Sequence, residues 1–435
     1  MQQSPITAFF KKDPGSSGSR SEDQRPDSDR QGRRPGPYHS RGGSSTPSTR
    51  GQHRGGKSAR NRELKKVAQE TKDVLPAALK SLPGFGADVS AVYDLDALAP
   101  LDPADCPGYV LPAGDEDAGS TGTRIRVLDQ DSLDAAIELQ PAYKAQRHLS
   151  TLPAATSGPY DSEREASSST EDDEMDLDGH PVAQPQPQPT APSWDLSARP
   201  PQKAEPAKLS QKTTASKPTP KAKTYTIPPF SRLTPSPVLV LNLASERHPG
   251  GGWQTGAMAQ EESLCYRSSL YRSLHRAFYP LPSLSVIYTP SVLIIRAATT
   301  AGHTLYPDKA LDLPVASVLS VAALRHPTLT ADGARFADPA QHAETKRKIR
   351  VSLRLAARMG HGRLVLGALG CGVFANPPTD VAQCFLQVFC EPEFQGGWWE
   401  DVVFAVMDNK SGGESGKDGR GNYGHFHRAL HGRVV

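Results

Sequence analysis

The second half of the chain alternates short apolar runs with amphipathic stretches. Apolar runs typical of buried strands occur at 238–243, 285–288, 292–296, 315–321, 364–366 and 402–406. Helical spacing of apolar residues predicts helices over 264–278, over 342–359 and through Val381, Phe385 and Val388. Strands interleaved with helices predict an α/β sheet that is covered on both faces.

Weaker periodic patterns precede this region. Apolar residues fall at helical spacing over 64–79, and Pro76 is expected to end or kink that helix. Residues 123–128 alternate like an edge strand. Ser132 is the expected N-cap of a short helix that runs to Leu139.

Two stretches carry no such pattern, and they hold 18 of the chain's 40 prolines. One is the N-terminal tail, and the other joins an acidic run to the Gln-Pro repeats at 184–189. Neither has enough apolar residues to offset the entropy of ordering. We therefore expect a disordered basic tail over 1–57, the N-terminal part of the folded domain over 58–148, a disordered acidic and proline-rich insertion over 149–224, and the domain core over 225–435.

Charge and cysteine content bear on the partners and the cellular compartment of the protein. Residues 1–62 hold 13 basic and 5 acidic residues, so the tail is expected to make weak contacts with nucleic acid. The acidic run at 160–180 is interpreted as solvated chain. The 5 cysteines include no Cys-x-x-Cys pair, which favours a reducing compartment. No apolar stretch approaches the length of a membrane span, so we expect a soluble intracellular protein without membrane contact.

The most informative segment lies between a predicted strand and a predicted helix. Gly250, Gly251 and Gly252 follow the strand that ends at 243, and such a turn lets backbone amides approach a diphosphate closely. Glu261 and Glu262 then begin the helix, and acid–base work on a glycosidic bond needs a carboxyl group there. The alternative is a flexible turn followed by ordinary N-terminal glutamates. The continuous run through both features favours a site.

This run closely resembles the signature of the microbial (bacterial-like) poly(ADP-ribose) glycohydrolases, which are catalytic members of the macrodomain superfamily. The signature is Asn-Phe-Ala-Ser, then Pro-Gly-Gly-Gly-Trp, then Gly-Ala-x-Ala-Gln-Glu-Glu-x-Leu-Cys, and here Leu243 replaces the Phe. The resemblance extends over about 60–144 and 225–435, and its further matches are Ala68, Glu70 and Thr71 in an N-terminal helix and 364–374 in a second phosphate loop. Two positions depart from the pattern. Tyr266 precedes Arg267 where the family has Arg directly after Leu-Cys, and Ala375 stands where Gly is common.

The resemblance implies a macrodomain-like three-layer α/β/α fold with a mixed sheet, accompanied by the long disordered segments. Glu262 would be the catalytic acid, and Glu261 would assist it by holding the ribose. The ligand-binding residues it implies are Gly250, Gly251, Gly252, Gln260, Gly370, Gly372, Val373 and Phe374. Because backbone amides would grip the diphosphate, no cofactor and no metal is expected. His425, His427 and His431 lack a Cys or carboxylate partner at suitable spacing and are assigned to a C-terminal helix.

The N-terminus carries a second motif. Gln3, Ile6, Phe9 and Phe10 fill the pattern Gln-x-x-(Ile/Leu/Met)-x-x-aromatic-aromatic, the PIP box of ligands of the sliding clamp PCNA. One 3₁₀ turn would bring the three apolar residues onto one face. A chance apolar cluster is the alternative, although the tail is otherwise poor in apolar residues.

These features together predict a nuclear poly(ADP-ribose) glycohydrolase. It would hydrolyse ribose–ribose O-glycosidic bonds, release ADP-ribose from poly(ADP-ribose) on modified proteins, and be recruited to replication and repair sites by the clamp. The alternative is a non-catalytic ADP-ribose reader tethered to the clamp, and the intact Glu261–Glu262 pair argues against it. A clamp-tethered scaffold with a vestigial domain is a third interpretation.

Overall fold

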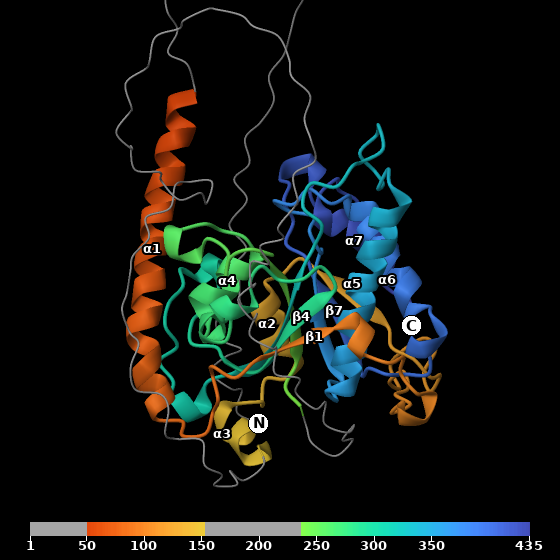
Figure 1. Ribbon diagram of the computed structural model, residues 1–435, viewed down its shortest axis with the longest axis horizontal. Helices are drawn as coiled ribbons and strands as arrows, with labels where there is room; N and C mark the ends of the chain where they lie inside the picture. The colour runs from red at the N-terminus through yellow and green to blue at the C-terminus, as the bar shows by residue number, and fades with distance from the viewer. Residues whose placement is uncertain (1–49, 153–235) are drawn as a thin grey trace, which may run out of the picture. The chain divides into compact units, whose positions relative to one another are not determined.

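A seven-stranded mixed sheet forms the centre of the protein (Figure 1). The computed structural model describes residues 50–152 and 236–435, so the predictions for the PIP box, most of the basic tail and nearly all of the insertion lie outside the described residues. In spatial order the strands are β1 (Ala91–Asp94), β4 (Ser285–Leu293), β5 (Val315–Ala322), β3 (Leu239–Ala244), β6 (Arg363–Leu366), β7 (Asp401–Ala405) and β2 (Ile125–Leu128). The pairings β1–β4 and β4–β5 are antiparallel, and the remaining pairings are parallel.

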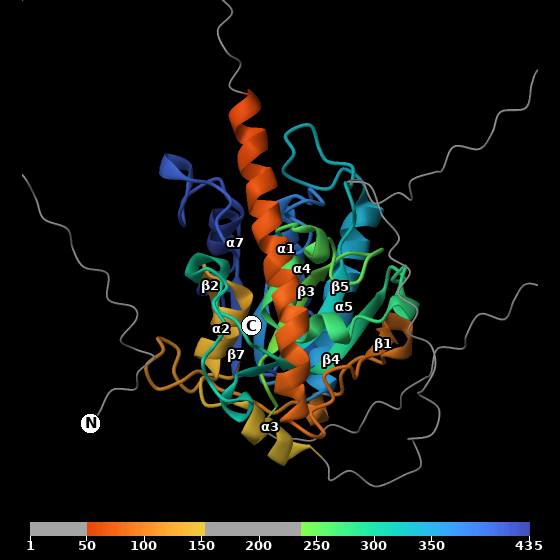
Figure 2. The same ribbon diagram turned by 90° about the vertical axis from the view of Figure 1, so that its left-hand side faces the viewer.

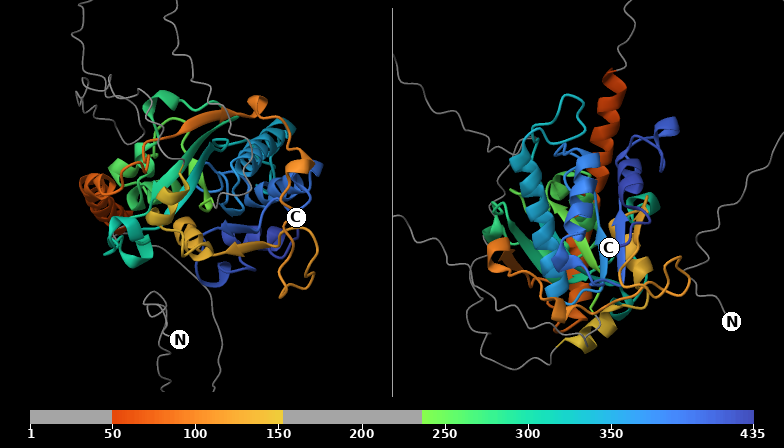
Figure 3. Two further views of the ribbon diagram at one scale, coloured as in Figure 1. Left: turned by 90° about the horizontal axis from the view of Figure 1, so that it is seen from below. Right: turned by 90° about the vertical axis from the view of Figure 1, so that its right-hand side faces the viewer.

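Helices cover both faces of this sheet, as the sequence predicts (Figures 1 and 2). One face carries α1 (Arg50–Lys80), α2 (Ser132–Leu139) and α4 (Gln260–Arg267), and α3 (Ala145–Thr151) lies below them in Figure 1. The other face carries α5 (Pro339–Arg358), α6 (Pro378–Phe389) and α7 (Asn422–Leu430), which are the blue helices seen side by side in Figure 3. The layers are thus α/β/α, and no described helix is both long enough and apolar enough to cross a bilayer.

Strand β3 shows how the apolar pattern builds the two cores. Leu239 and Leu241 pack in the cluster that contains the α5 and α6 side chains. Val238 and Val240 pack in the cluster that contains α1, α2 and α4 side chains. Successive side chains of a strand point to opposite faces, so a strand that is buried on both faces reads as a continuous apolar run.

The parallel strands bring three loops to one edge of the sheet. The loops that follow β3, β5 and β6 all leave from the carboxyl ends of neighbouring strands. The β3–β5 pairing continues to Ala244 opposite Ala322, whereas the β3–β6 pairing stops at Val240 opposite Val365. Strands β3 and β6 therefore part toward this edge, where α/β sheets commonly bind their ligands.

Two predicted elements beside this edge differ from the structure. The strands expected at 285–288 and 292–296 are one strand, β4, with a register shift between Thr289 and Val292. Pro290 lies in this interval and has no backbone N–H for the ladder. The helix expected over 264–278 ends at Arg267, because Ser268 adopts an extended backbone (φ −148°) and bridges to Ile294, and 3₁₀ turns follow.

Two helix boundaries also differ from the prediction. Pro76 lies inside α1, which continues to Lys80. Leu75 is fully buried and Leu79 packs against the same core cluster, and their burial outweighs the one hydrogen bond that proline removes. The N-cap of α2 is Asp131, whose carboxylate accepts the backbone N–H of Leu133 at 2.8 Å. The predicted cap Ser132 is the first helical residue.

Candidate active site

The Glu261–Glu262 pair stands at the start of α4, as predicted, and points into the loop after β3. The carboxylate of Glu262 accepts the backbone N–H groups of Gly252 and Ala259, both at 2.9 Å. Glu262 is 8% exposed to solvent. One carboxylate oxygen therefore contacts each end of the 252–259 segment, and this fixes the orientation of the Glu262 side chain.

Glu261 lies deeper, with 3% of its surface exposed. Its carboxyl group accepts the N–H of Ser245 at 2.8 Å and the side-chain amide of Asn242 at 3.4 Å. Burial and, to a smaller extent, the neighbouring charge of Glu262 together raise the pKa of Glu261 to about 8, against the lowering effect of these hydrogen bonds. Glu261 therefore keeps a proton at neutral pH.

Glycine is needed in this turn because the two carboxyl groups lie close to the turn's backbone. Gly250 and Gly251 adopt left-handed backbone angles, with φ of 71° and 60°. A Cβ atom on Gly251 would lie 2.3 Å from Oε1 of Glu262 and 3.0 Å from Oε2 of Glu261. The amides of Gly250 and Gly252 are directed at the two carboxyl groups. The binding of a diphosphate by this turn stays a prediction.

Gln260 completes the edge of β3 where β6 has departed. Its Oε1 accepts the N–H of Leu243 at 2.9 Å, and its Nε2 donates to the carbonyl of Leu241 at 2.7 Å. The carbonyl of Val238 accepts an N–H from β5, and backbone groups of successive residues point to opposite sides of a strand. The odd-numbered residues of β3 therefore direct their backbone groups toward β6. The Gln260 amide thus replaces two ladder hydrogen bonds. Its predicted contact with the ligand remains untested.

The second loop, at 370–376, follows β6 at the same edge. Gly370 has a φ of 72°, and a Cβ on it would lie 2.4 Å from Nδ2 of Asn376 and 2.5 Å from Cβ of Ala323. Asn376 is 3% exposed, and its amide donates to the carbonyls of Leu324 at 2.6 Å and Gly370 at 3.2 Å. Asn376 therefore joins the loops after β5 and β6. The sequence interpretation missed it, because an Asn before two prolines reads as an ordinary turn residue.

The tip of this second loop presents free backbone donors. Within the described residues, the N–H groups of Gly372, Val373 and Phe374 donate to no protein acceptor. Val373 is 70% exposed, and no atom lies within 4 Å of a Cβ built on Gly372. Successive unpaired amides that point to one side can bind an anion. The structure therefore brings three free backbone donors to the edge that carries the carboxyl pair, and their binding of an anion stays a prediction.

The two departures from the family pattern have local structural roles. The hydroxyl of Tyr266 lies 2.8 Å from the carbonyls of both Trp253 and Ala257, and so holds the end of the glycine turn. Arg267 is fully buried and pairs with Asp131 and Asp134 of the α2 region. Ala375 adopts a φ of 55°, a conformation that costs a non-glycine residue roughly 1 kcal/mol.

The N-terminal helix supports α4 from behind. Thr71 donates its hydroxyl to the carbonyl of Tyr266 at 2.7 Å, and Arg296 donates to Thr71 at 2.9 Å and to Glu70 at 2.7 Å. A Cβ on Gly256 would lie 2.3 Å from the carbonyl oxygen of Asn61 in α1. Glu70 and Thr71 therefore support α4, although they precede it by nearly two hundred residues in the sequence.

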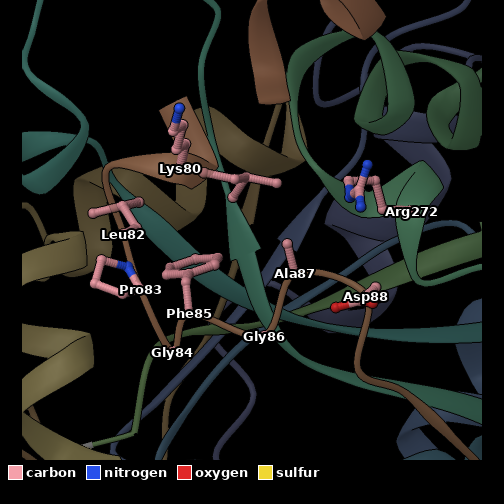
Figure 4. A pocket seen from close by; sticks show the side chains of 10 residues that line it. Lys80, Leu82, Pro83, Gly84, Phe85, Gly86, Ala87, Asp88 and Arg272 are labelled. Carbon is pink, nitrogen blue, oxygen red and sulfur yellow. The ribbon is translucent and has the colours of Figure 1, made fainter. Parts of the chain in front are cut away.

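Two other features lie apart from this site. His427 and His431 stack at 4.3 Å, and no group of three metal-ligating side chains occurs within residues 50–152 and 236–435. A cavity of about 310 Å³ opens at the carboxyl end of α1, with Lys80, Asp88 and Arg272 around Phe85 (Figure 4). Leu79 in its wall lies about 27 Å along the helix from Asn61, so this cavity is not part of the carboxyl site.

Known proteins are similar to this chain. Residues 188–297, which include the carboxyl pair, match the family model for the microbial-type PARG catalytic domain. A poly(ADP-ribose) glycohydrolase from Deinococcus radiodurans, solved in complex with ADP-ribose, is 33% identical over 44% of this chain and 75% of its own, with a TM-score of 0.35. The glycohydrolase from Thermomonospora curvata, solved with the inhibitor ADP-HPD, is 21% identical over 84% of this chain and 99% of its own, with a TM-score of 0.48. No curated protein sequence shows significant similarity to the chain.

The family match and the paired carboxyl groups identify an enzyme of the glycosidase class. The chain belongs to the family of microbial-type poly(ADP-ribose) glycohydrolases, since the family model spans the carboxyl pair and a relative shares 33% of its residues over three quarters of that relative's length.

Proposed function

We propose that this protein hydrolyses the ribose–ribose O-glycosidic bonds of poly(ADP-ribose) and releases ADP-ribose. One observation carries the proposal: the buried carboxyl pair and the three free amides of the second loop lie at the same edge of the sheet. The free amides of Gly372, Val373 and Phe374 suit the diphosphate of an ADP-ribose unit. A diphosphate held there would bring the terminal ribose toward the carboxyl groups.

In this proposal Glu262 performs the proton transfers. It donates a proton to the oxygen of the leaving ribose as the glycosidic C–O bond breaks and an oxocarbenium-like centre develops. It then takes a proton from the water that attacks the anomeric carbon, so that the carboxyl group is regenerated. Protonated Glu261 donates a hydrogen bond to a ribose hydroxyl, which its raised pKa permits at neutral pH.

Replacing the acid tests this assignment. We expect Glu262→Gln to lower the release of ADP-ribose from poly(ADP-ribosyl)ated protein at least a thousandfold, while the Kd for ADP-ribose stays within about threefold. The amide is nearly isosteric with the carboxyl group and keeps its oxygen for the N–H of Gly252. The exposed Glu63→Gln on α1 is the matched control. Normal turnover by the Glu262 variant would exclude Glu262 as the acid.

The same assay separates the enzyme from a non-catalytic reader. A reader would bind ADP-ribose without releasing it from a modified protein, and it would have no need of a buried acid. The raised pKa of Glu261 and the fixed orientation of Glu262 support the enzyme. Absence of ADP-ribose release by the purified wild-type chain, with binding retained, would favour the reader.

We further propose that the N-terminal motif recruits the enzyme to the PCNA sliding clamp, in the nucleus, at sites of replication and repair. The support is the sequence pattern of Gln3, Ile6, Phe9 and Phe10. The basic tail around this motif would add weak contacts with nucleic acid. A peptide of residues 1–15 should bind the clamp, and changing Phe9 and Phe10 to Ala should abolish binding. An unmodified peptide without measurable affinity would contradict recruitment by this motif.

A further inference from the structure

We infer that Arg247, Arg276 and Arg325 form a phosphate-binding surface for poly(ADP-ribose), beyond the unit that occupies the two loops. This arginine surface rests on the proposed function, because its ligand is the polymer that the site would cut. The inference adds to that function a contact between the enzyme and the next ADP-ribose unit of the polymer.

The three arginines come from three separate loops and converge. Arg247 follows β3, Arg325 follows β5, and Arg276 lies in the 3₁₀ turn before β4. The N–H of Leu281 donates to the carbonyl of Glu246 at 2.8 Å, which ties the segment after Arg276 to the loop that carries Arg247. Burial lowers the pKa of His248, and the charges of all three arginines lower it further. The Glu246 carboxylate joins Arg247 to Arg325, and the Leu281–Glu246 hydrogen bond holds the segment after Arg276 beside them.

Their charge is only partly neutralised. Glu246 pairs with Arg247 at 3.2 Å and with Arg325 at 3.1 Å, and Arg276 forms no ion pair with any residue that the structure describes. The side chains of Arg247 and Arg325 are 62% and 44% exposed. Glu246 thus holds two arginines in place and leaves a net positive surface open to solvent. Guanidinium groups bind phosphate oxygens in a fixed fork geometry.

This surface adjoins both ligand loops. The guanidinium carbon of Arg325 lies 4.7 Å from the centroid of the Phe374 ring in the second loop. The carbonyl of His248, next to Arg247, accepts the N–H of Gly251 at 3.0 Å in the glycine turn. A polymer of ADP-ribose carries a diphosphate in every repeat. A chain whose terminal unit lies between the loops can therefore place the phosphates of its next unit on the arginine surface.

The experiment compares polymer with monomer. Arg247→Gln/Arg276→Gln is made in the Glu262→Gln background, so that the polymer is not consumed, and Arg325 is kept because it contacts Phe374. We expect the Kd for chains of several ADP-ribose units to rise about tenfold at 0.1 M salt, and the slope of log Kd against log salt to fall by about one. The Kd for ADP-ribose itself should not change.

A matched control removes the same charge elsewhere. Arg126→Gln/Arg347→Gln changes two exposed arginines, 46% and 47% exposed, on β2 and α5. This control should bind polymer as the parent does. Equal losses in the test and control variants, an equal loss for monomer and polymer, or unchanged polymer binding would each overturn the inference. So would an equal loss of affinity for single-stranded DNA, which would assign the surface to nucleic acid.

The inference and the proposed function fail separately. A wild-type chain that releases no ADP-ribose refutes the hydrolase, and polymer binding that is insensitive to the two arginines refutes the arginine surface. A parent protein that binds monomer but gains nothing from a longer chain also refutes the surface, whatever its turnover.

Discussion

The backbone of Gly251 lies against the carboxylate of Glu262 so closely that a Cβ atom would come within 2.3 Å of Oε1. We expect Gly251→Ala to displace Glu262 and to lower ADP-ribose release more than a hundredfold. The backbone at φ 60° adds strain of roughly 1 kcal/mol. Release of ADP-ribose, quantified by chromatography, measures the effect.

Gly333→Ala is the control for backbone strain. Gly333 has a similar φ of 68°, but no atom lies within 4 Å of its Cβ position. Gly333→Ala should lose about 1 kcal/mol of unfolding free energy through strain alone, Gly251→Ala should lose more because Glu262 is displaced, and only Gly251→Ala should lose activity. Equal activity in the two variants would show that contact with the carboxylate is unimportant.

Glu261 makes the stability of the protein fall as the pH rises from 4.5 to about 8. Its pKa is about 8 in the folded chain, against an ordinary value of 4.5, so its contribution is fully present below pH 4.5 and is lost as the pH rises through 8. Glu261→Gln should therefore become more stable relative to the wild type by roughly 4 kcal/mol between pH 5 and pH 9. Urea unfolding at each pH measures the difference. Glu63→Gln should show no such trend. If the unfolding free energy of Glu261→Gln varied with pH in parallel with that of the wild type, this would contradict the raised pKa.

Gln260 is expected to stabilise the fold through backbone groups. Gln260→Leu leaves the N–H of Leu243 and the carbonyl of Leu241 buried without partners, which should lower the unfolding free energy by about 2–4 kcal/mol. Gln69→Leu, at an exposed site on α1, should change it by less than about 0.5 kcal/mol. Chemical denaturation compares the two. A loss of ADP-ribose affinity without a loss of stability would instead assign Gln260 to the ligand.

Two buried histidines should make the protein acid-sensitive. Burial lowers the pKa of both His148 and His361 to about 4, so the unfolded chain binds more protons between pH 6.5 and pH 4. Stability should fall as the pH drops through this interval, by up to about 3 kcal/mol for each histidine. Unfolding free energy is measured against pH for the wild type and for His361→Gln. The slope below pH 6.5 should be shallower in the variant. An unchanged slope would exclude His361 as a source of it.

The residues that the sequence predicts for the chemistry lie close together along the chain. The glycine turn and the glutamate pair lie within thirteen positions, from Gly250 to Glu262. The continuous apolar run at 238–241 likewise predicts a strand that is buried on both faces, and the structure places β3 at the centre of the sheet. Such patterns arise from local geometry, so a single sequence displays them.

Contacts between distant segments could not be predicted in this way. The end of α4 at Arg267 depends on a bridge from Ser268 to Ile294, and the second loop depends on Asn376 reaching the carbonyl of Leu324. The amide of Gln260 acquires its role only because β6 leaves β3 after Val240. No local pattern encodes these partners.

By itself, the sequence determined that an α/β domain carries a glycine turn and two glutamates with the signature of a family, because apolar periodicity and a short motif are properties of neighbouring residues. Only the tertiary structure decided which glutamate is buried more deeply and keeps its proton, which amides of the second loop have no protein acceptor, and that Glu246 pairs with arginines from two separate loops. Burial, hydrogen-bond partners and the summing of charges depend on which segments meet in space, and folding brings those segments together from distant parts of the chain.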